Sequence, residues 1–226
     1  MNNYLIEFRF QGRAKKRLKE IIWDVDKTCR IGNANRKRPV PHISLAIIKT
    51  NNERKLIGDF ARLCTKTDIM SFTLKHFSTF EDNKVVYFDI NPDKKLDEFR
   101  WALSKTLQPY CTLQSTDQNR KYHFHSTIAM RLTPRKFQQV KSYVQKKKLP
   151  HFKNVVMRVT LLKNNRILKE YDFMQRKLFD RNLAKSRYVY NRSVGMLMDY
   201  IEGKKDNNIK KDNLLKRIKN WFSKND

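Results

Sequence analysis

The chain repeats one order of secondary structure, and this repeat limits the folds that are open to it. Apolar residues at strand or helix spacing predict strand, helix, strand, helix and strand at 4–10, 13–29, 42–49, 53–63 and 69–77. The same order follows at 85–90, 93–107, 122–131, 134–146 and 155–162. We therefore expect two similar units of strands and helices that face each other.

A histidine lies in the second strand of each half, at a matched distance from the first. Tyr4 precedes His42 by 38 residues, and Val85 precedes His125 by 40. This spacing predicts that the two histidine strands occupy corresponding places in the two units.

Two further features follow the repeat. A strand at 167–173 comes after the turn formers Asn164 and Asn165, which predict a hairpin. The composition then becomes basic and polar, with apolar residues at helical spacing. We predict a body at 1–194 and, at 195–226, a basic linker with an amphipathic C-terminal helix. The sequence leaves open whether this helix docks on the body, contacts RNA or binds a partner helix.

The charge balance points to a polyanionic partner. The 226 residues include 50 lysines and arginines against 22 acidic residues, which gives a net charge of +28. Such an excess favours nucleic acid or an anionic surface. A hydrophobic content of 39% is enough for a core. No run of 18 apolar residues occurs, so we expect no membrane span.

Cysteine and glycine usage exclude several classes of protein. The three cysteines, Cys29, Cys64 and Cys111, are far apart and form no CxxC pair, which argues against a disulfide framework and a cysteine zinc site. This usage favours a reducing compartment, and we expect the cytoplasm. With five glycines, the chain has no Gly-rich phosphate loop of the kind that ATP-dependent kinases and ligases use.

Three histidines are followed two positions later by a hydroxyl residue. The pairs are His42/Ser44, His76/Ser78 and His125/Thr127. The first and third lie in apolar strands at corresponding places in the repeat, whereas we interpret His76 as a strand-end histidine. Residues i and i+2 of a strand point to one face, roughly 6.5–7 Å apart. Two imidazoles and two hydroxyls are thus expected to converge on one cleft.

This set of groups suits in-line phosphoryl transfer. One neutral imidazole takes a proton from the attacking oxygen, and one protonated imidazole gives a proton to the leaving oxygen. The sequence does not assign these roles between His42 and His125. Polar residues on an edge strand without chemistry are the structural alternative. His123 and His125 share a strand face and could bind a metal, but no third ligand has suitable spacing. We therefore expect no metal and no cofactor.

The two motifs and the order of elements resemble the 2H phosphoesterase superfamily, specifically its 2′-5′ RNA ligase-like / RNA 2′,3′-cyclic phosphodiesterase branch, over residues 1–175. The resemblance implies an α+β, bilobal fold with two pseudo-symmetric sheet-and-helix lobes around a central cleft. It makes His42 and His125 catalytic and Ser44 and Thr127 phosphate donors. Relatives often carry an arginine five residues after the second histidine. Met130 stands there, and Arg131 is the expected substitute because it shares strand parity with His125.

The resemblance implies a metal-independent hydrolase that opens 2′,3′-cyclic phosphate ends of RNA to 2′-phosphates, with reversible 2′-5′ ligation as the reverse reaction. The expected partner is RNA, bound by a monomer. The alternative is an RNA-binding module of the same fold without efficient turnover. Basic residues directly before each histidine, and one tyrosine, are the predicted RNA contacts. They are Arg36, Lys37, Arg38, Arg120, Lys121 and Tyr122.

Overall fold

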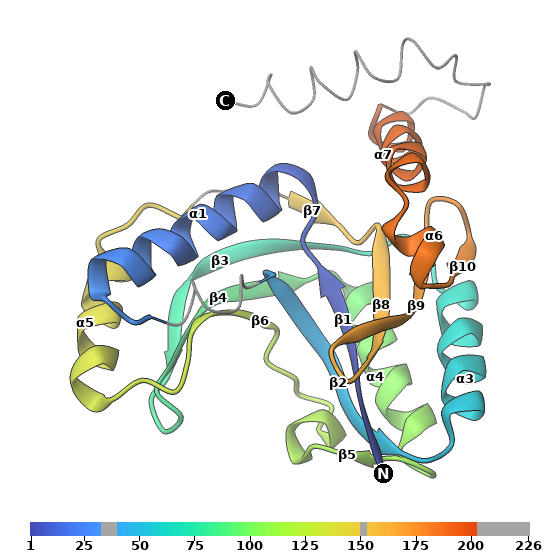
Figure 1. Ribbon diagram of the computed structural model, residues 1–226, viewed down its shortest axis with the longest axis horizontal. Coiled ribbons are helices and arrows are strands. Elements are labelled where there is room, and N and C mark those ends of the chain that lie inside the picture. The colour runs from blue at the N-terminus through green and yellow to red at the C-terminus, as the bar shows by residue number, and fades with distance from the viewer. Residues whose placement is uncertain (33–39, 150–152, 203–226) are drawn as a thin grey trace.

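The computed structural model describes residues 1–32, 40–149 and 153–202 (Figure 1). The predicted RNA contacts Arg36, Lys37 and Arg38 lie outside the described residues, as does most of the predicted C-terminal helix. Within the described ranges, no helix is both long enough and apolar enough to span a membrane.

The strands form two antiparallel sheets. One has six strands in the order β10-β9-β8-β1-β2-β5, and the other has four in the order β6-β4-β3-β7. The six-stranded sheet consists of β1 (Asn2–Arg9), β2 (His42–Thr50), β5 (Thr112–Leu113), β8 (Arg158–Lys163), β9 (Arg166–Asp172) and β10 (Lys177–Phe179). The four-stranded sheet consists of β3 (Ser71–Phe80), β4 (Val85–Pro92), β6 (His125–Ala129) and β7 (Lys153–Val155).

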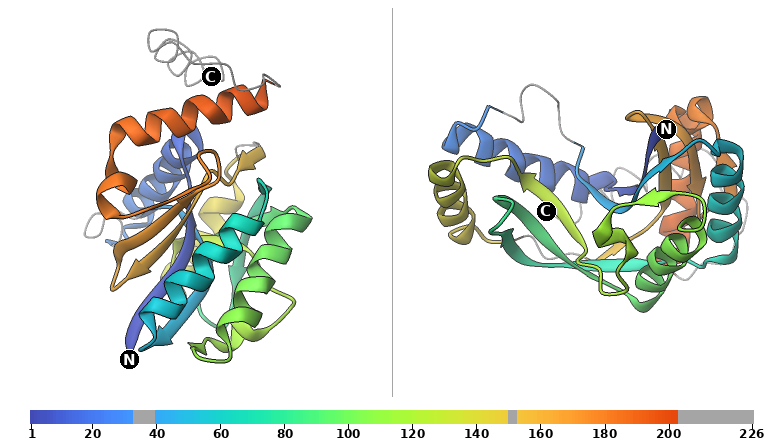
Figure 2. Two further views of the ribbon diagram at one scale, coloured as in Figure 1. Left: turned by 90° about the vertical axis from the view of Figure 1, so that its right-hand side faces the viewer. Right: turned by 90° about the horizontal axis from the view of Figure 1, so that it is seen from below.

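Two pairs of helices accompany the two sheets. Helices α1 (Gly12–Cys29) and α5 (Pro134–Gln145) contact each other and the four-stranded sheet, while α3 (Glu53–Lys66) and α4 (Lys94–Leu107) contact each other and the six-stranded sheet (Figure 2). Between these layers lies an apolar core, in which the rings of Phe8, Phe10 and Phe72 meet edge to face at 5.2–5.5 Å. The predicted α+β class with two sheet-and-helix lobes is confirmed.

The lobes are not the two consecutive halves of the repeat. Strand β3 comes from the first half but pairs with β4 of the second, and β8 comes from the second half but pairs with β1 of the first. The same exchange explains why the strand predicted at 155–162 is two strands. The chain crosses from β7 in one sheet to β8 in the other between Val155 and Arg158.

Local sequence signals set several element ends. The side chains of Asn52, Asp93 and Thr133 accept hydrogen bonds from backbone N–H groups in the first turns of α3, α4 and α5. Asn164 and Asn165 both have left-handed φ values, of 49° and 64°, in the hairpin between β8 and β9. The predicted hairpin turn is confirmed.

The C-terminal helices pack on the six-stranded sheet through a buried arginine. Arg158 donates from Nε to Asp172 at 2.6 Å, from Nη1 to Glu170 at 3.0 Å and from Nη2 to Ser193 at 2.8 Å. Ser193 belongs to α7 (Arg187–Ile201), which follows the short α6 (Arg181–Lys185). Because α7 runs through residue 195, the predicted boundary there falls inside a helix rather than at the start of a linker.

Candidate active site

The first motif lies where the alternation of strand faces predicts. His42 and Ser44 are half-buried on β2, while Ile43 and Leu45 between and beyond them are fully buried in the core. The Nδ1 atom of His42 lies 2.9 Å from the carbonyl oxygen of Val40. Because a carbonyl can only accept, this contact assigns the Nδ1 proton and leaves Nε2 free in the neutral ring.

The second motif has the same local geometry. His125 and Thr127 are half-buried on β6, and Ser126 and Ile128 point into the core. Nδ1 of His125 lies 2.9 Å from the carbonyl oxygen of His123, again two residues earlier in the chain. The two histidines therefore carry the same tautomer and present the same nitrogen.

The structure brings these two motifs together from different sheets. Strands β2 and β6 contact each other. The pKa of His125 is lowered, first by burial and then by the positive charges of His123 and His42. His125 thus holds a neutral imidazole at a lower pH than an ordinary histidine does.

The strand beside β2 contributes an arginine and a buried glutamate that sequence reasoning missed. Arg9 of β1 pairs across the sheet with His42, and Glu7 pairs with Ser44. The Glu7 carboxylate contacts Nε of Arg9 and lies 3.8 Å from Nε2 of His42. The sequence signal for these residues was that Glu7 and Arg9 are charged in an otherwise apolar strand. The sequence did not show which strand pairs with this one.

The strand beside β6 contributes different chemistry. Asp89 of β4 pairs with His125, and Tyr87 pairs with Thr127. The Asp89 carboxylate is buried and lies 3.1 Å from Nε2 of His123 and 3.6 Å from Nε2 of His76. The carboxylate beside this motif is thus shared by two histidines outside the pair.

The interpretation of His76 as a strand-end histidine was wrong. Strand β3 continues to Phe80, and His76 lies inside it at a register shift between Leu74 and Phe77. The acidic residues Glu81 and Asp82, which suggested an end, form the turn between β3 and β4 instead. The His-x-Ser spacing of this segment was the signal that could have placed it near the site.

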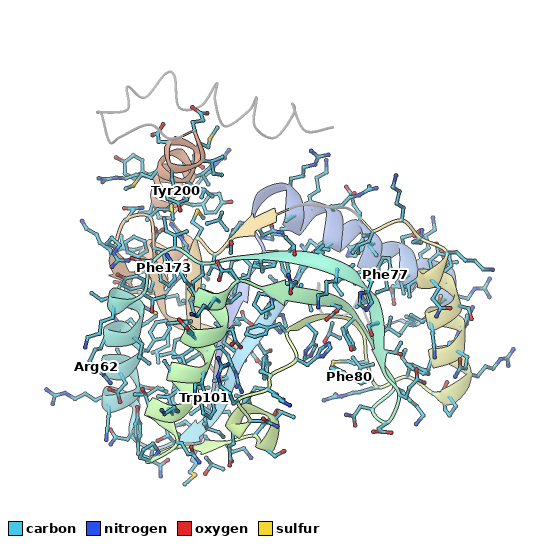
Figure 3. All side chains as sticks on the ribbon, turned by 180° about the vertical axis from the view of Figure 1, so that it is seen from behind. Arg62, Phe77, Phe80, Trp101, Phe173 and Tyr200 are labelled. Carbon is cyan, nitrogen blue, oxygen red and sulfur yellow. The ribbon has the colours of Figure 1, made fainter. Side chains whose placement is uncertain are left out.

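An aromatic wall stands beside the second motif. Phe80 packs 4.3 Å from Tyr87, and both rings lie 5.1–5.3 Å from the imidazoles of His123 and His125. Phe80 lies near the end of the β3–β4 hairpin, across the molecule from Trp101 on α4 (Figure 3). This wall contributes to the burial that lowers the pKa of His125.

Tyr122 connects the two motifs through its hydroxyl and packs against two neighbouring side chains. Its hydroxyl donates to the carbonyl oxygen of Ser44 at 2.9 Å, and the guanidinium of Arg100 lies 4.0 Å from its ring centroid. Phe124 meets the ring edge-on at 5.0 Å. Burial also raises the pKa of this phenol, so it stays a donor. An RNA contact of Tyr122 stays a prediction.

The other predicted cations differ in their placement. Arg120 pairs with Asp97 at 2.5 Å and lies 6.0 Å from the Trp101 ring, whereas Lys121 is exposed. Strand β6 ends at Ala129, and Arg131 beyond it has a left-handed φ of 57°. The strand parity that was to align Arg131 with His125 therefore does not exist. Among the described residues, no three potential ligands of the His, Cys, Asp and Glu types gather into a metal site.

One comparison with known proteins covers most of the chain. The family model described as the 2′-5′ RNA ligase superfamily matches residues 13–167. No curated protein sequence matches the chain.

Solved structures with a similar course of the chain include Usb1 from Kluyveromyces marxianus and LigT from E. coli in its apo form. Usb1 is 9% identical with a TM-score of 0.47, covering 74% of this chain and 96% of its own. LigT is 15% identical with a TM-score of 0.45, covering 76% of this chain and 98% of its own. Because the family model spans more than half of the sequence, the chain belongs to the 2′-5′ RNA ligase superfamily of 2H phosphoesterases.

Proposed function

We propose that the protein hydrolyses 2′,3′-cyclic phosphate ends of RNA to 2′-phosphates, with His42 and His125 as a general acid–base pair and without a metal ion. One observation carries the proposal. Two histidines on contacting strands each donate Nδ1–H to the carbonyl two residues earlier. This leaves two equivalent Nε2 atoms available for proton transfer at one phosphorus.

The surroundings of the two rings support separate roles. Burial and neighbouring positive charge lower the pKa of His125, so a neutral ring is available there as the base. His125 takes a proton from water as the new P–O bond forms. The P–O3′ bond breaks, and a protonated His42 gives its proton to the leaving 3′-oxygen. The Glu7 carboxylate lies 3.8 Å from Nε2 of His42, on the same side of the ring as the proton to be donated.

The hydroxyls of Ser44 and Thr127 complete the pair. Each lies two residues beyond its histidine and is half-buried like it. Hydroxyl donors on the non-bridging oxygens stabilise charge that grows in the transition state. Run in reverse, the same groups would join a 2′-phosphate end to a 5′-hydroxyl end.

RNA is the substrate class that the charge favours. The net charge of +28 is far more than one nucleotide requires, and RNA binding through it weakens steeply with salt. Arg36, Lys37 and Arg38 before His42, and Arg120 and Lys121 before His125, remain the proposed contacts. We propose a monomer in the cytoplasm, in keeping with the free thiols of Cys29, Cys64 and Cys111.

A non-catalytic RNA-binding module is the second candidate. It is favoured by Met130, which occupies the place where relatives often carry an arginine. Such a module would keep the fold and charge but release cyclic phosphate ends unchanged.

The decisive experiment incubates the protein with a 2′,3′-cyclic-phosphate oligonucleotide in EDTA. Replacing either catalytic histidine by alanine should lower turnover by about 10²–10⁴-fold while RNA binding is retained. His76→Ala is the matched control, since it removes a histidine on the same sheet that is not one of the pair. Full activity in His42→Ala or His125→Ala would disprove the assignment. Binding without turnover in the wild type would favour the module, and activity lost in EDTA but restored by zinc would favour a metal enzyme.

A further inference from the structure

We propose that β1 completes the phosphate site, with Arg9 as the cation that binds the non-bridging oxygens and Glu7 as the residue that positions Arg9 beside His42. This inference rests on the proposed phosphodiesterase function. Both residues precede the segment 13–167 that the family model matches. They are therefore features of this chain that the family assignment does not supply.

The register of β1 and β2 places four polar residues on one sheet face. Arg9 is the cross-strand partner of His42, and Glu7 is the partner of Ser44. Directly paired residues of an antiparallel sheet share a face and lie about 4.5–5.5 Å apart. The intervening Phe8 points into the core. An arginine therefore lies next to the proposed acid.

Glu7 is buried, and its contacts explain how a charge is kept there. The residue is 3% exposed, and a carboxylate in such a position is costly unless it is paired. One carboxylate oxygen accepts from Nε of Arg9, and the other lies 3.8 Å from Nε2 of His42. Glu7 thus binds the guanidinium of Arg9 and lies near the imidazole of His42.

Arg9 keeps its terminal nitrogens for a ligand. Its side chain is 25% exposed, and Nε is the atom that binds Glu7. Among the residues that the structure describes, neither Nη group of Arg9 has a hydrogen-bond partner. Planar guanidinium forks bind phosphate oxygens in pairs, which a single ammonium cannot do.

Among the described residues on the strands that pair with the two histidines, the cation comes from β1. Asp89 occupies, beside His125, the place that Arg9 occupies beside His42. Arg131 lies beyond the end of β6, in a left-handed conformation. At the start of α1, burial and then the positive charges of Lys19 and Arg9 lower the pKa of Lys15, so Arg9 lies close to a second basic side chain. Of the described residues paired with the two histidines, Arg9 is thus the one that can bind an anionic phosphate.

The test compares Arg9→Ala, Arg9→Lys and Glu7→Gln with Arg166→Ala as the matched control, an exposed arginine of the same sheet. Arg9→Ala should lower kcat by about 10²-fold, as the loss of one transition-state donor does. Arg9→Lys should recover part of this loss, and added guanidinium ion should partly rescue Arg9→Ala. Arg166→Ala should keep wild-type turnover.

A double-mutant cycle tests the positioning role of Glu7. Glu7→Gln should lower kcat by about tenfold in the wild type but have little further effect in Arg9→Ala, because coupled residues are non-additive. The unfolding midpoint of each variant shows whether it is folded. Rescue of Arg9→Ala by guanidinium ion is a second control, because only folded protein can be rescued.

The outcomes separate this inference from the proposed function. Arg9→Ala within twofold of the wild type, with His42→Ala inactive, would overturn the inference and leave the function standing. A Glu7→Gln effect that is equally large in both backgrounds would overturn the positioning role. A wild-type protein that does not hydrolyse the cyclic phosphate would overturn the proposed function itself, and with it this inference.

Discussion

The two histidine strands match in backbone geometry and differ in what stands beside them. On β2 and β6 alike, a histidine and a hydroxyl share one face, and each Nδ1 lies 2.9 Å from a carbonyl oxygen. Beside His42, β1 places Arg9 and Glu7; beside His125, β4 places Asp89 and Tyr87. The repeated motif therefore sets where each histidine lies, and the neighbouring strand sets which charged groups stand beside it.

The largest expected effect separates acid from base. With a phosphodiester whose leaving group is a nitrophenolate, the departing oxygen needs no proton. His42→Ala should then regain most of the activity that it loses on RNA, whereas His125→Ala should remain impaired by about 10²-fold or more, because the attacking water still needs a base. The measurement is kcat/KM of each variant on both substrates. Equal recovery in the two variants would contradict the assignment of roles, and recovery in His125→Ala alone would reverse it.

A smaller effect is expected where the two strands are joined. Tyr122→Phe removes the hydroxyl that donates to the Ser44 carbonyl but keeps the ring that stacks on Arg100. The loss of this hydrogen bond should lower the free energy of unfolding by about 1 kcal/mol. Denaturant unfolding measures this, and Tyr188→Phe, at an exposed tyrosine, is the control. A change as small as that of the control would show that Tyr122 does not couple the motifs.

The smallest effect concerns the charge near His125. Burial and then the positive charge of His123 lower the pKa of His125, so the acidic limb of the kcat/KM profile should lie below the ordinary histidine value of about 6.5. In His123→Gln the backbone carbonyl that binds Nδ1 remains, but the positive charge is gone. The pKa of His125 should rise, and the acidic limb should move toward higher pH. A shift toward lower pH, or none, would show that His123 does not act on the base.

The repeat could be predicted from the sequence because it depends on local patterns of residues. Strand alternation at His42 and His125, the caps of the helices and the Asn164–Asn165 turn all depend on residues a few positions apart. Arg9 and Glu7 could not be placed in this way, since their role depends on the register between β1 and β2, which are far apart along the chain. His76 was misplaced for the related reason that β3 pairs in the sheet of the other half.

Tyr122 and Arg131 show a second limit. Tyr122 was expected at the start of a strand, but it precedes β6, and its hydroxyl donates to the carbonyl oxygen of Ser44. The prediction that Arg131 faces the same way as His125 required the strand to continue to residue 131. Arg131 instead has a left-handed φ, so it is not part of the strand. Both errors concern the path of the backbone rather than the chemistry of the side chain.

The exchange of β3 and β8 between the halves has a consequence for how the protein folds. Tyr4 of β1 pairs with Lys163 of β8, so these two strands of the six-stranded sheet pair only after the chain has reached residue 163. Contacts so distant in sequence carry a large loop-closure entropy and are formed slowly. Neither half can complete its own sheet, and a fragment that ends at the β3–β4 hairpin would hold His42 without its partner. The two histidine strands, β2 and β6, therefore come together only after strands of both halves have paired.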